Sequence, residues 1–209
     1  MRQTDPEEEA YLRAQVKEEI RRRRRSVRRA LPRAARLARS EAICERVLAL
    51  PEWSEARTVL AFVSMPKEVQ TTRAVEAAWA AGKRVATTRM NATFDGLELR
   101  EWREGDELEE SGMMFLQPPA DAPWVPDDEV DLVLVPALAV DERGHRVGYG
   151  KGFYDRLLPR LTRALRVGLV FDFERIAEVP DWEGDQPVDV VVTDARTERT
   201  GADGAPRAR

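Results

Sequence analysis

The sequence has few of the residues that define several classes of protein. Its 209 residues include one cysteine and one histidine, Cys44 and His145. A single cysteine excludes an internal disulfide framework and a cysteine-cluster metal site. A Ser-His-Asp or Cys-His arrangement would have to use His145, which lies in a stretch typical of a polar loop. The chain has no run of 18 apolar residues, so we expect no membrane span.

The composition is that of a folded and heavily charged chain. Hydrophobic residues make up 43% of the sequence and charged residues 34%, which allows a sizeable core under an ionic surface. The opening "MRQTDPEEEA" has no apolar segment of the signal-peptide kind, so we expect a cytoplasmic protein. We also expect a flexible acidic lead over residues 1–10, a single α/β domain over 11–195 and a disordered tail over 196–209.

Positive charge is concentrated near the N-terminus. Residues 13–46 hold 13 of the 34 Lys and Arg residues and 4 of the 38 Asp and Glu residues. This segment therefore carries a net charge of +9, while the rest of the chain carries −13. The cationic segment must bind anions, lie against the acidic remainder of the protein, or be solvated.

Apolar residues recur at helical spacing over residues 11–31, which predicts a helix with one apolar stripe. The stripe consists of Val16, Ile20, Val27 and Leu31. Pro32 suits the first turn of a second helix that runs to about residue 50. The two would form an N-terminal helical hairpin. Further helices are expected over residues 71–81 and 152–165.

Short apolar runs predict strands between the helices. The strongest is "VDLVLVPALAV" over residues 130–140, and "LELREW" is a weaker candidate. Continuous apolar strands that alternate with helices predict an α/β fold of Rossmann-like layered architecture, with a mostly parallel sheet and helices on both faces. Ligands of such sheets bind at the carboxyl ends of the strands. The other strands are expected over residues 58–65, 84–90, 166–173 and 188–194.

The stretch "RVGYGKGFYDRLL" follows the strongest strand and is rich in glycine and positive charge. Gly148, Gly150 and Gly152 allow backbone conformations in which successive N–H groups converge on one anion. Arg146 and Lys151 add full positive charges for phosphate oxygens. The helix expected after this loop would contribute its positive N-terminal end. The sequence therefore predicts a polyphosphate cradle here.

The loop matches neither of two common phosphate-binding motifs. Gly-Lys is followed by Gly152 instead of the Ser or Thr of a Walker A loop, and the glycine spacing differs from the dinucleotide fingerprint. Asp155 lies just after the loop and is a candidate ligand for Mg²⁺, which binds through one or two carboxylates together with substrate phosphates. Asp185 and Asp189, close to the last strand, are candidates for a second carboxylate.

The chain resembles the 5-formyltetrahydrofolate cyclo-ligase family, also called methenyltetrahydrofolate synthetases, from about residue 17 to 194. The glycine loop is the most specific element of this resemblance. It is joined, in the same order along the chain, by "KEEIR", "FVSMPKEVQT", "VDLVLVPALAVDERGH" and "VPDWEGDQPVDVVVTD". The chain departs from the family pattern at Thr88, Ala137, Val140 and Gly184.

The resemblance implies an ATP- and Mg²⁺-dependent reaction. The formyl oxygen of 5-formyltetrahydrofolate attacks the γ-phosphate of ATP, and N10 then closes the ring to give 5,10-methenyltetrahydrofolate, ADP and phosphate. Such chemistry depends on positioning and charge neutralisation more than on a protein nucleophile. Lys151 and Arg146 are the implied catalytic residues. The implied ATP-binding residues are Lys17, Arg21, Arg146, Val147, Gly148, Tyr149, Gly150, Lys151, Gly152, Phe153 and Tyr154.

The resemblance also implies a folate site and a metal site. Glu68 would accept hydrogen bonds from the N–H groups of the pterin, and Val63 would line the same pocket. Asp155 and Asp185 are the implied magnesium ligands. The expected partners are small molecules, with no nucleic acid and no membrane, and the expected state is a monomer or weak dimer. The remaining implied substrate-binding residues are Tyr149, Gly150, Lys151, Gly152 and Phe153.

Two other interpretations of the sequence stay open. "RRRRRSVRR", residues 21–29, resembles an arginine-rich RNA-binding segment, although no aromatic residues interleave the arginines. The chain could instead be an inactive relative that keeps the fold and binds a nucleotide or folate. The intact glycine loop argues against that second interpretation, while the four departures argue for it.

Overall fold

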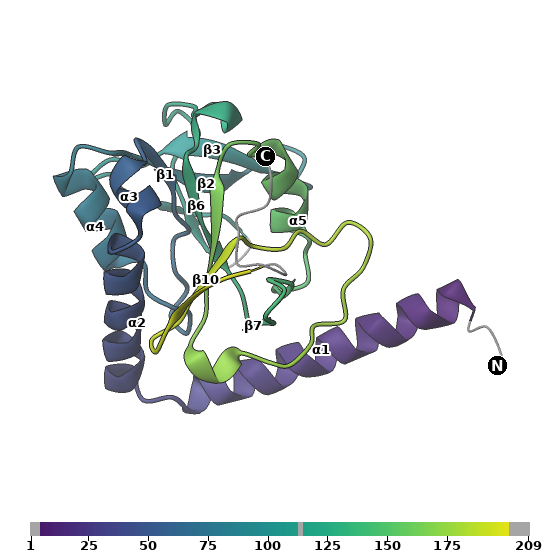
Figure 1. The fold of residues 1–209 in the computed structure, drawn as a ribbon. Coiled ribbons are helices and arrows are strands. Elements are labelled where there is room, and N and C mark those ends of the chain that lie inside the picture. The colour runs from purple at the N-terminus through teal and green to yellow at the C-terminus, as the bar shows by residue number, and fades with distance from the viewer. Residues whose placement is uncertain (1–4, 113–114, 201–209) are drawn as a thin grey trace.

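A seven-stranded sheet forms the centre of the computed structural model, which describes residues 5–112 and 115–200 (Figure 1). The strand order is β11-β10-β9-β6-β1-β2-β3. The five central strands are parallel, and β11 and β3 are antiparallel at the two edges. These strands are β1 Thr58–Leu60, β2 Arg84–Met90, β3 Leu97–Glu101, β6 Leu132–Pro136, β9 Leu165–Leu169, β10 Val190–Val192 and β11 Thr197–Arg199. The expected mostly parallel α/β sheet is confirmed.

Helices and short ladders complete the fold. Two small antiparallel pairs, β4 with β5 and β7 with β8, lie outside the main sheet. The helices are α1 Pro6–Ala30, α2 Arg33–Leu48, α3 Pro51–Glu55, α4 Thr72–Ala80 and α5 Phe153–Leu157, with 3₁₀ turns η1 Asp127–Glu129, η2 Leu158–Arg160 and η3 Asp172–Glu174. The short strands are β4 Glu109–Glu110, β5 Leu116–Gln117, β7 Ala139–Val140 and β8 Arg146–Val147.

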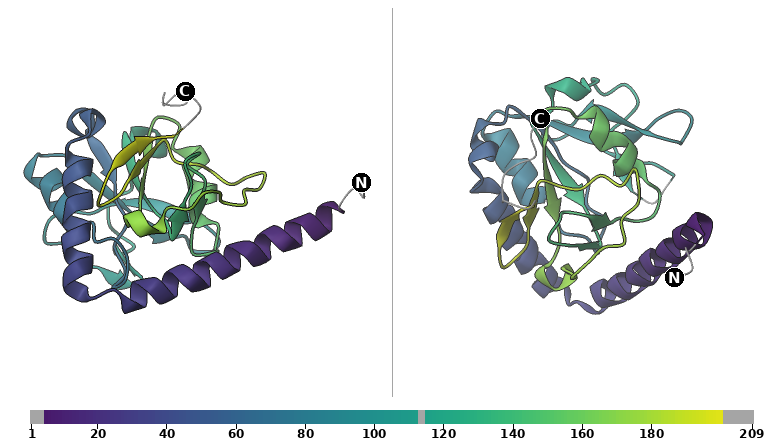
Figure 2. Two further views of the ribbon diagram at one scale, coloured as in Figure 1. Left: turned by 60° about the horizontal axis from the view of Figure 1, so that its bottom comes forward. Right: turned by 45° about the vertical axis from the view of Figure 1, so that its right-hand side comes forward.

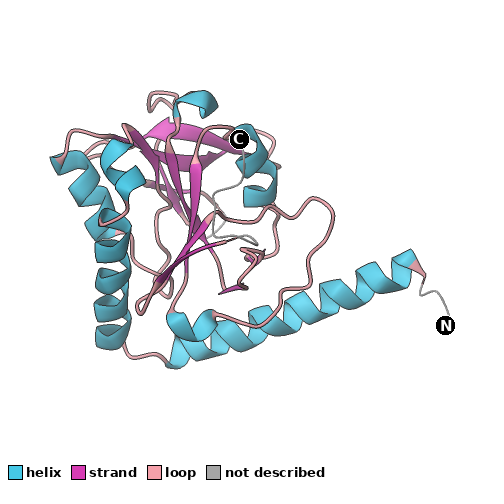
Figure 3. Cartoon of the chain, viewed as in Figure 1, coloured by secondary structure: helices cyan, strands magenta, loops and turns pink. Residues whose placement is uncertain are grey.

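The sheet is covered on both faces (Figure 3). One buried cluster joins α2, α3 and α4 to residues of β1, β6, β9 and β10, among them Ile43, Trp53 and Leu134. A second cluster lies on the opposite face, where Leu157 and Leu158 pack against residues such as Val133. Successive strand residues alternate between the two clusters, as the pleat of a strand requires. Burial on both faces explains why β6 and β10 are apolar at every position.

The carboxyl ends of the parallel strands meet at one edge, which carries the long loops. After β1 the chain forms a loop over residues 61–71, so the strand expected over 58–65 ends at Leu60. After β6 the β7–β8 ladder leads into the glycine-rich loop, residues 148–152. Helix α1 contacts β7 and β8 and runs past this edge, with its N-terminal half extending beyond the sheet (Figure 2).

Helix α1 differs from the sequence prediction in its start and its buried face. It begins at Pro6, where Asp5 accepts a hydrogen bond from the N–H of Glu7, so part of the expected flexible lead is helical and residues 1–4 lie outside the described chain. Val16 and Val27 of the expected apolar stripe are 48% and 44% exposed. Ile20 and Leu31 of the same stripe pack against buried clusters. The helix also buries arginine, and Arg28 is only 2% exposed.

Three further expectations are corrected. α1 and α2 diverge from their junction instead of packing side by side as a hairpin (Figure 1). The helix expected over residues 152–165 is the five-residue α5 followed by η2, so its dipole contributes little to anion binding. The expected tail includes β11, which pairs with β10, and residues 201–209 lie outside the described chain. Within the described ranges, no helix is both long and apolar enough to cross a bilayer.

Candidate functional site

The glycine-rich loop takes up a conformation that depends on two of its glycines. Gly150 has φ +94° and Gly152 has φ +64°, a region that favours glycine. A Cβ added at Gly150 would lie 3.2 Å from the guanidinium carbon of Arg21, and one at Gly152 would lie 2.9 Å from an Arg156 nitrogen. Across the described chain, the backbone N–H groups of residues 149–152 find no hydrogen-bond acceptor. The loop therefore has backbone donors that are available to a ligand.

Cations from α1 and from the loop gather beside these donors. Arg21 donates from Nε to the carbonyl of Gly148 at 2.9 Å. Lys17, one turn earlier, forms an ion pair with the carboxylate of Asp185. Arg146 is 8% exposed and donates to Asp155 Oδ1 at 3.0 Å. Four side chains predicted to serve ATP and Mg²⁺ are thus joined in two carboxylate–cation pairs.

The two metal candidates lie next to each other in the fold, because Asp155 Oδ1 also accepts the backbone N–H of Gln186 at 3.2 Å. Asp185 Oδ2 accepts the backbone N–H of Trp182 at 2.9 Å. Both bonds to Asp155 use Oδ1, which leaves Oδ2 available. No cluster of three or more His, Cys, Asp or Glu side chains able to hold a metal is found among residues 5–112 and 115–200. The donor set fits Mg²⁺ only where phosphate oxygens or waters complete it.

A buried polar network ties the loop to the rest of the molecule. Arg28 donates to both carboxylate oxygens of Glu174, at 2.6 and 2.7 Å, and its side chain is 3% exposed. The same guanidinium donates to the carbonyl of Ala137 at 2.6 Å and to the Tyr149 hydroxyl at 3.1 Å. The Tyr149 hydroxyl also interacts with the carboxyl of Glu68. This Arg28 network therefore links α1, η3, the glycine loop and the loop after β1.

Burial shifts the titration of the groups in this network. It raises the pKa of Glu68, although the N–H of Met65, the Tyr149 hydroxyl and the charge of Arg28 oppose the rise. Burial and the nearby charge of Glu68 raise the pKa of Tyr149 and of Tyr154, so both phenols are neutral at ordinary pH. For Arg28, burial alone would lower the pKa, but hydrogen bonds from Arg28 to Glu174 outweigh it and the pKa is raised.

One buried polar atom of the site lacks a partner. The hydroxyl oxygen of Tyr154 is inaccessible to solvent and has no hydrogen-bond partner in the described part of the chain. A buried hydroxyl left unpaired is costly, so such atoms mark places where a ligand or an ordered water completes the structure. Tyr154 also interacts electrostatically with both Glu68 and Arg146.

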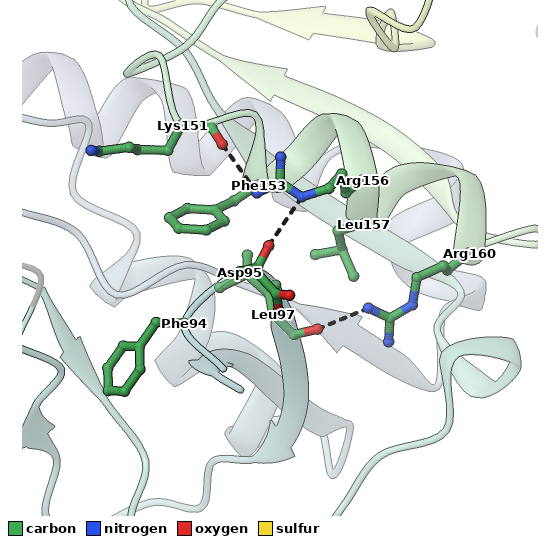
Figure 4. A pocket seen from close by; sticks show the side chains of 9 residues that line it. Phe94, Asp95, Leu97, Lys151, Phe153, Arg156, Leu157 and Arg160 are labelled. Carbon is green, nitrogen blue, oxygen red and sulfur yellow. Dashed lines mark hydrogen bonds between the residues drawn. The ribbon is translucent and has the colours of Figure 1, made fainter. Parts of the chain in front are cut away.

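Lys151 lines an open cleft of about 690 Å³ (Figure 4). Its side chain is exposed, and its ammonium group has no hydrogen-bond or ion-pair partner within the described ranges. Phe153 lines the same cleft, with the guanidinium of Arg156 5.3 Å from the centre of its ring. Lys151 is therefore free to meet an anionic ligand, in contrast to Arg146.

The family model described as 5-formyltetrahydrofolate cyclo-ligase family matches residues 13–194. The chain belongs to the 5-formyltetrahydrofolate cyclo-ligase family. The match spans the whole sheet apart from β11, and it contains α2 and the glycine-rich loop. The family resemblance carried by the sequence motifs is thereby confirmed.

Individual relatives agree with this assignment. The chain is 34% identical to the 5-formyltetrahydrofolate cyclo-ligase of Mycolicibacterium smegmatis over 182 residues, covering 83% of this chain and 89% of the relative. It is 31% identical to the enzyme of the same name from Escherichia coli, with 82% and 97% covered. Among solved structures, the Aquifex aeolicus 5,10-methenyltetrahydrofolate synthetase aligns with a TM-score of 0.80 at 27% identity, covering 93% of this chain and 97% of that one.

The positions where this cyclo-ligase family member departs from the expected pattern are mostly buried. Ala137 and Val140 are 2% and 1% exposed, and Thr88 is 7% exposed. Gly184 has φ +108°, a conformation that a histidine or another L-residue would adopt only with strain. The segment that carries Asp185 is therefore built around a glycine in this chain.

Two residues of the site were not predicted from the sequence. Arg28 and Glu174 hold the Arg28 network together but were not predicted as site residues. Arg28 could have been found, since residues 21, 24, 25 and 28 recur at the spacing of one helix face. Glu174 gave no comparable signal, because it lies 146 positions away along the chain. Val63 is half-buried in the loop after β1, and its predicted role stays a prediction.

Proposed function

We propose that this chain catalyses the ATP- and Mg²⁺-dependent cyclisation of 5-formyltetrahydrofolate to 5,10-methenyltetrahydrofolate. The observation that carries the proposal is the glycine-rich loop, whose unpaired backbone donors lie beside Arg21 of α1 and within the matched family region. A cytoplasmic location belongs to the same proposal.

The nucleotide phosphates are assigned to the loop. Donors from residues 149–152 would contact the terminal phosphates, and Lys17 and Arg21 would neutralise charge from the α1 side. Arg146 is paired with Asp155, so its role is to fix that carboxylate and to add positive potential. Lys151, which is unpaired, is assigned to the transferring phosphoryl group.

The pterin is assigned to the space beside Glu68, Tyr149 and Tyr154. Glu68 lies in the loop after β1 and would accept hydrogen bonds from pterin N–H groups. The unpaired hydroxyl of Tyr154 supplies a further polar contact for the same ring. The Arg28 network joins Tyr149 of the glycine-rich loop to Glu68 of the loop after β1. The two substrates would therefore be held by one rigid unit.

The proposed reaction has two steps. In the first, the formyl oxygen on N5 attacks the γ-phosphorus, the bond to the bridging oxygen breaks and ADP leaves. In the second, N10 attacks the activated formyl carbon, loses its proton, and inorganic phosphate leaves with the former formyl oxygen. The residues of this chain hold the reacting atoms in line and offset the negative charge, which can lower such a barrier substantially.

Magnesium, when bound, would shield the phosphate charges during this transfer. Asp155, through its available Oδ2, and Asp185 are the residues proposed to hold it. Their present cationic partners, Arg146 and Lys17, lie where phosphate oxygens would compete for them. A metal bound by two carboxylates and substrate oxygens would be weak without nucleotide.

The direct test is product formation. Purified protein, Mg-ATP and 5-formyltetrahydrofolate should give the near-ultraviolet absorbance of methenyltetrahydrofolate, with one ADP released per product molecule. Omission of either ATP or Mg²⁺ should abolish the signal. A folded protein that binds Mg-ATP but forms no product at high enzyme concentration would instead support an inactive nucleotide-binding relative.

The role of Lys151 can be measured separately. We expect Lys151→Ala to lower kcat by roughly 100-fold or more, the effect typical of losing one transition-state charge contact. Because this side chain is exposed, the melting temperature should not change. Lys151→Arg, which keeps the charge, should recover part of the rate. A Lys151→Ala variant with near-normal kcat would remove Lys151 from this role.

A further inference from the structure

The first turn of helix α2 has backbone donors without acceptors. The helix begins at Arg33, after Pro32, and no side chain caps its start. The N–H of Arg36 donates to the carbonyl of Pro32, whereas the N–H groups of residues 33–35 meet no acceptor in the described chain. Free N–H groups at the positive end of a 16-residue helix attract anions. Water satisfies such groups at many helix ends, so a ligand requires further evidence.

Arg36 of the same turn supplies that evidence, because its charge is buried without a partner. The residue is 6% exposed, and its Nε and Nη1 atoms are shielded from solvent with no hydrogen-bond partner in residues 5–112 and 115–200. Its Nη2 atom likewise donates to no described acceptor, and Arg36 forms no ion pair with a described carboxylate. Arginine is almost never fully buried unless it is paired, since removing a charge from water is costly.

The arginines on either side of Arg36 show what kind of partner it lacks. Arg28, whose side chain is 3% exposed, donates to both carboxylate oxygens of Glu174. Arg39, three residues beyond Arg36, pairs with the carboxylate of Asp194. Arg36 is nearly as buried as Arg28 and has no such pair within the described ranges. It therefore needs a negative charge that the described chain does not supply.

The guanidinium of Arg36 and the free N–H groups belong to one end of α2, at the corner where α1 and α2 meet (Figure 1). Arg36 lies on the buried face of the helix together with Ser40, whose hydroxyl accepts the N–H of Gln70 at 3.0 Å. This face therefore packs on the loop after β1, residues 61–71. Helical side chains lean towards the N-terminus of their helix, which directs Arg36 to the inner side of the first turn.

We propose that Arg36 and the first turn of α2 form a binding site for a small oxyanion of the phosphate class. The planar guanidinium contacts two of its oxygens, and the free N–H groups of residues 33–35 contact a third. Chloride, with a single acceptor atom, fits this donor set less well. The site shares no residue with the glycine-rich loop, so the inference does not depend on the proposed function.

The test is thermal unfolding in inorganic phosphate and in chloride at matched ionic strength. Isothermal titration calorimetry gives the Kd for phosphate, and at ten times this concentration the melting temperature of the unmodified protein should rise by about 3–6 °C. Arg36→Met, which keeps an unbranched apolar stem, should lose this shift. In chloride alone, Arg36→Met should melt about 2 °C or more above the unmodified protein, because a buried unpaired charge has been removed.

Two control variants show whether the effect belongs to this site. Arg33→Gln removes an exposed charge from the same turn, so it should keep most of the shift in phosphate. Lys151→Ala removes the unpaired cation of the glycine-rich loop and should also keep it. A shift that is lost in Arg36→Met and kept in both controls would support the site.

Three results would overturn the inference. An equal shift in Arg36→Met and the unmodified protein would show that phosphate binds elsewhere, such as the glycine-rich loop. A lower melting temperature of Arg36→Met in chloride would show that a group of this chain already neutralises Arg36. The third result is an unmodified protein that phosphate does not stabilise. None of these measurements involves turnover, so the proposed function can fail while this site stands.

Discussion

The two faces of helix α1 carry the same residue type in different settings. On the inner face, Arg21, Arg24 and Arg28 donate to the glycine loop, to the carbonyl of Phe173 and to Glu174. On the outer face, Arg22 and Arg23 pair with Glu19, and their side chains are 72% and 73% exposed. The comparison shows that the arginine run on this helix contains two sets of residues, one docked against the fold and one exposed to solvent. The sequence alone does not distinguish them.

The difference between the faces is one of solvation. A buried ion pair has lost the hydration of both ions, and it is stable only while every donor and acceptor is matched. Exposed pairs keep most of their hydration and are screened by salt, so they contribute little. The inner face therefore determines how α1 docks, although its individual ion pair need not add net stability over an apolar replacement.

The largest expected effect comes from breaking the buried pair on one side only. Arg28→Met should lower the free energy of unfolding by about 3–5 kcal/mol, because the buried carboxyl of Glu174 is left without its cationic partner. Replacing both partners, with Arg28→Met and Glu174→Leu, should restore most of the stability. Chemical denaturation followed by circular dichroism measures both variants.

The double variant also separates stability from function. It removes the hydrogen bond to the Tyr149 hydroxyl, so KM for 5-formyltetrahydrofolate should rise even where stability is recovered. A double variant as unstable as Arg28→Met would show that the pair itself, and not the unmatched charge, stabilises the protein. In that case the contrast with the outer face would need another explanation.

An intermediate effect is expected at the far end of the Arg28 network, in Glu68. Burial raises the pKa of Glu68, so the folded state holds its proton at pH values where the unfolded state, with its ordinary value of 4.5, has lost it. Stability from this group is therefore complete below pH 4.5 and is lost as pH rises above it. Glu68→Gln should remove this loss. The free energy of unfolding of the variant should therefore exceed that of the unmodified protein by an amount that grows with increasing pH.

The measurement is the free energy of unfolding of both proteins across a pH series starting below 4.5. The Gln amide can still accept from Met65 and donate to Tyr149, so the variant keeps the local geometry. Its KM for the folate should nonetheless rise, because it no longer offers a carboxylate to the pterin. Parallel stability curves for the two proteins would contradict the assigned burial of charge at Glu68.

The sheet and the glycine loop were predictable, since local patterns specify both. Continuous apolar strands such as β6 and the spacing of Gly150 and Gly152 are readable from neighbouring residues. The docking face of α1 was not predictable in this way. The long apolar stems of arginine pack like hydrophobic side chains, whereas a hydropathy scale counts only the charge of arginine. The predicted stripe was therefore half right: Ile20 and Leu31 pack against buried clusters, while Val16 and Val27 are exposed.

Contacts between distant segments of the chain are a second reason why parts of the site could not be predicted from the sequence. The partner of Arg28 is on η3, and Asp155 meets Gln186 across 31 positions. No spacing rule connects such residues, so the sequence left Asp185 and Asp189 as alternative partners for Asp155 and only the family resemblance chose Asp185. The cleft beside Lys151 was missed for the same reason, because the turn at Phe94 reaches α5 through Arg156 only in the folded chain.

The smallest effect is expected on the outer face of α1, and it completes the comparison. Hydrogen bonds from Arg22 and Arg23 lower the pKa of Glu19 to about 2, so the charged carboxylate is favoured above that pH. Arg22→Gln should let this pKa move back towards 4.5, as followed by NMR titration. Since the pair is exposed, the melting temperature should change by less than about 2 °C and the kinetic constants should not change.

Removing charge from the outer face of α1 also tests the arginine-rich RNA-binding interpretation. Only the outer arginines, Arg22, Arg23 and Arg29, have guanidinium groups that could contact RNA without undocking α1 from the glycine loop. If RNA binding exists, charge removal at Arg22 and Arg23 should weaken it and reduce its salt dependence, while cyclisation stays unchanged. A loss of cyclisation comparable to that of the inner-face variants would break the distinction between the two faces.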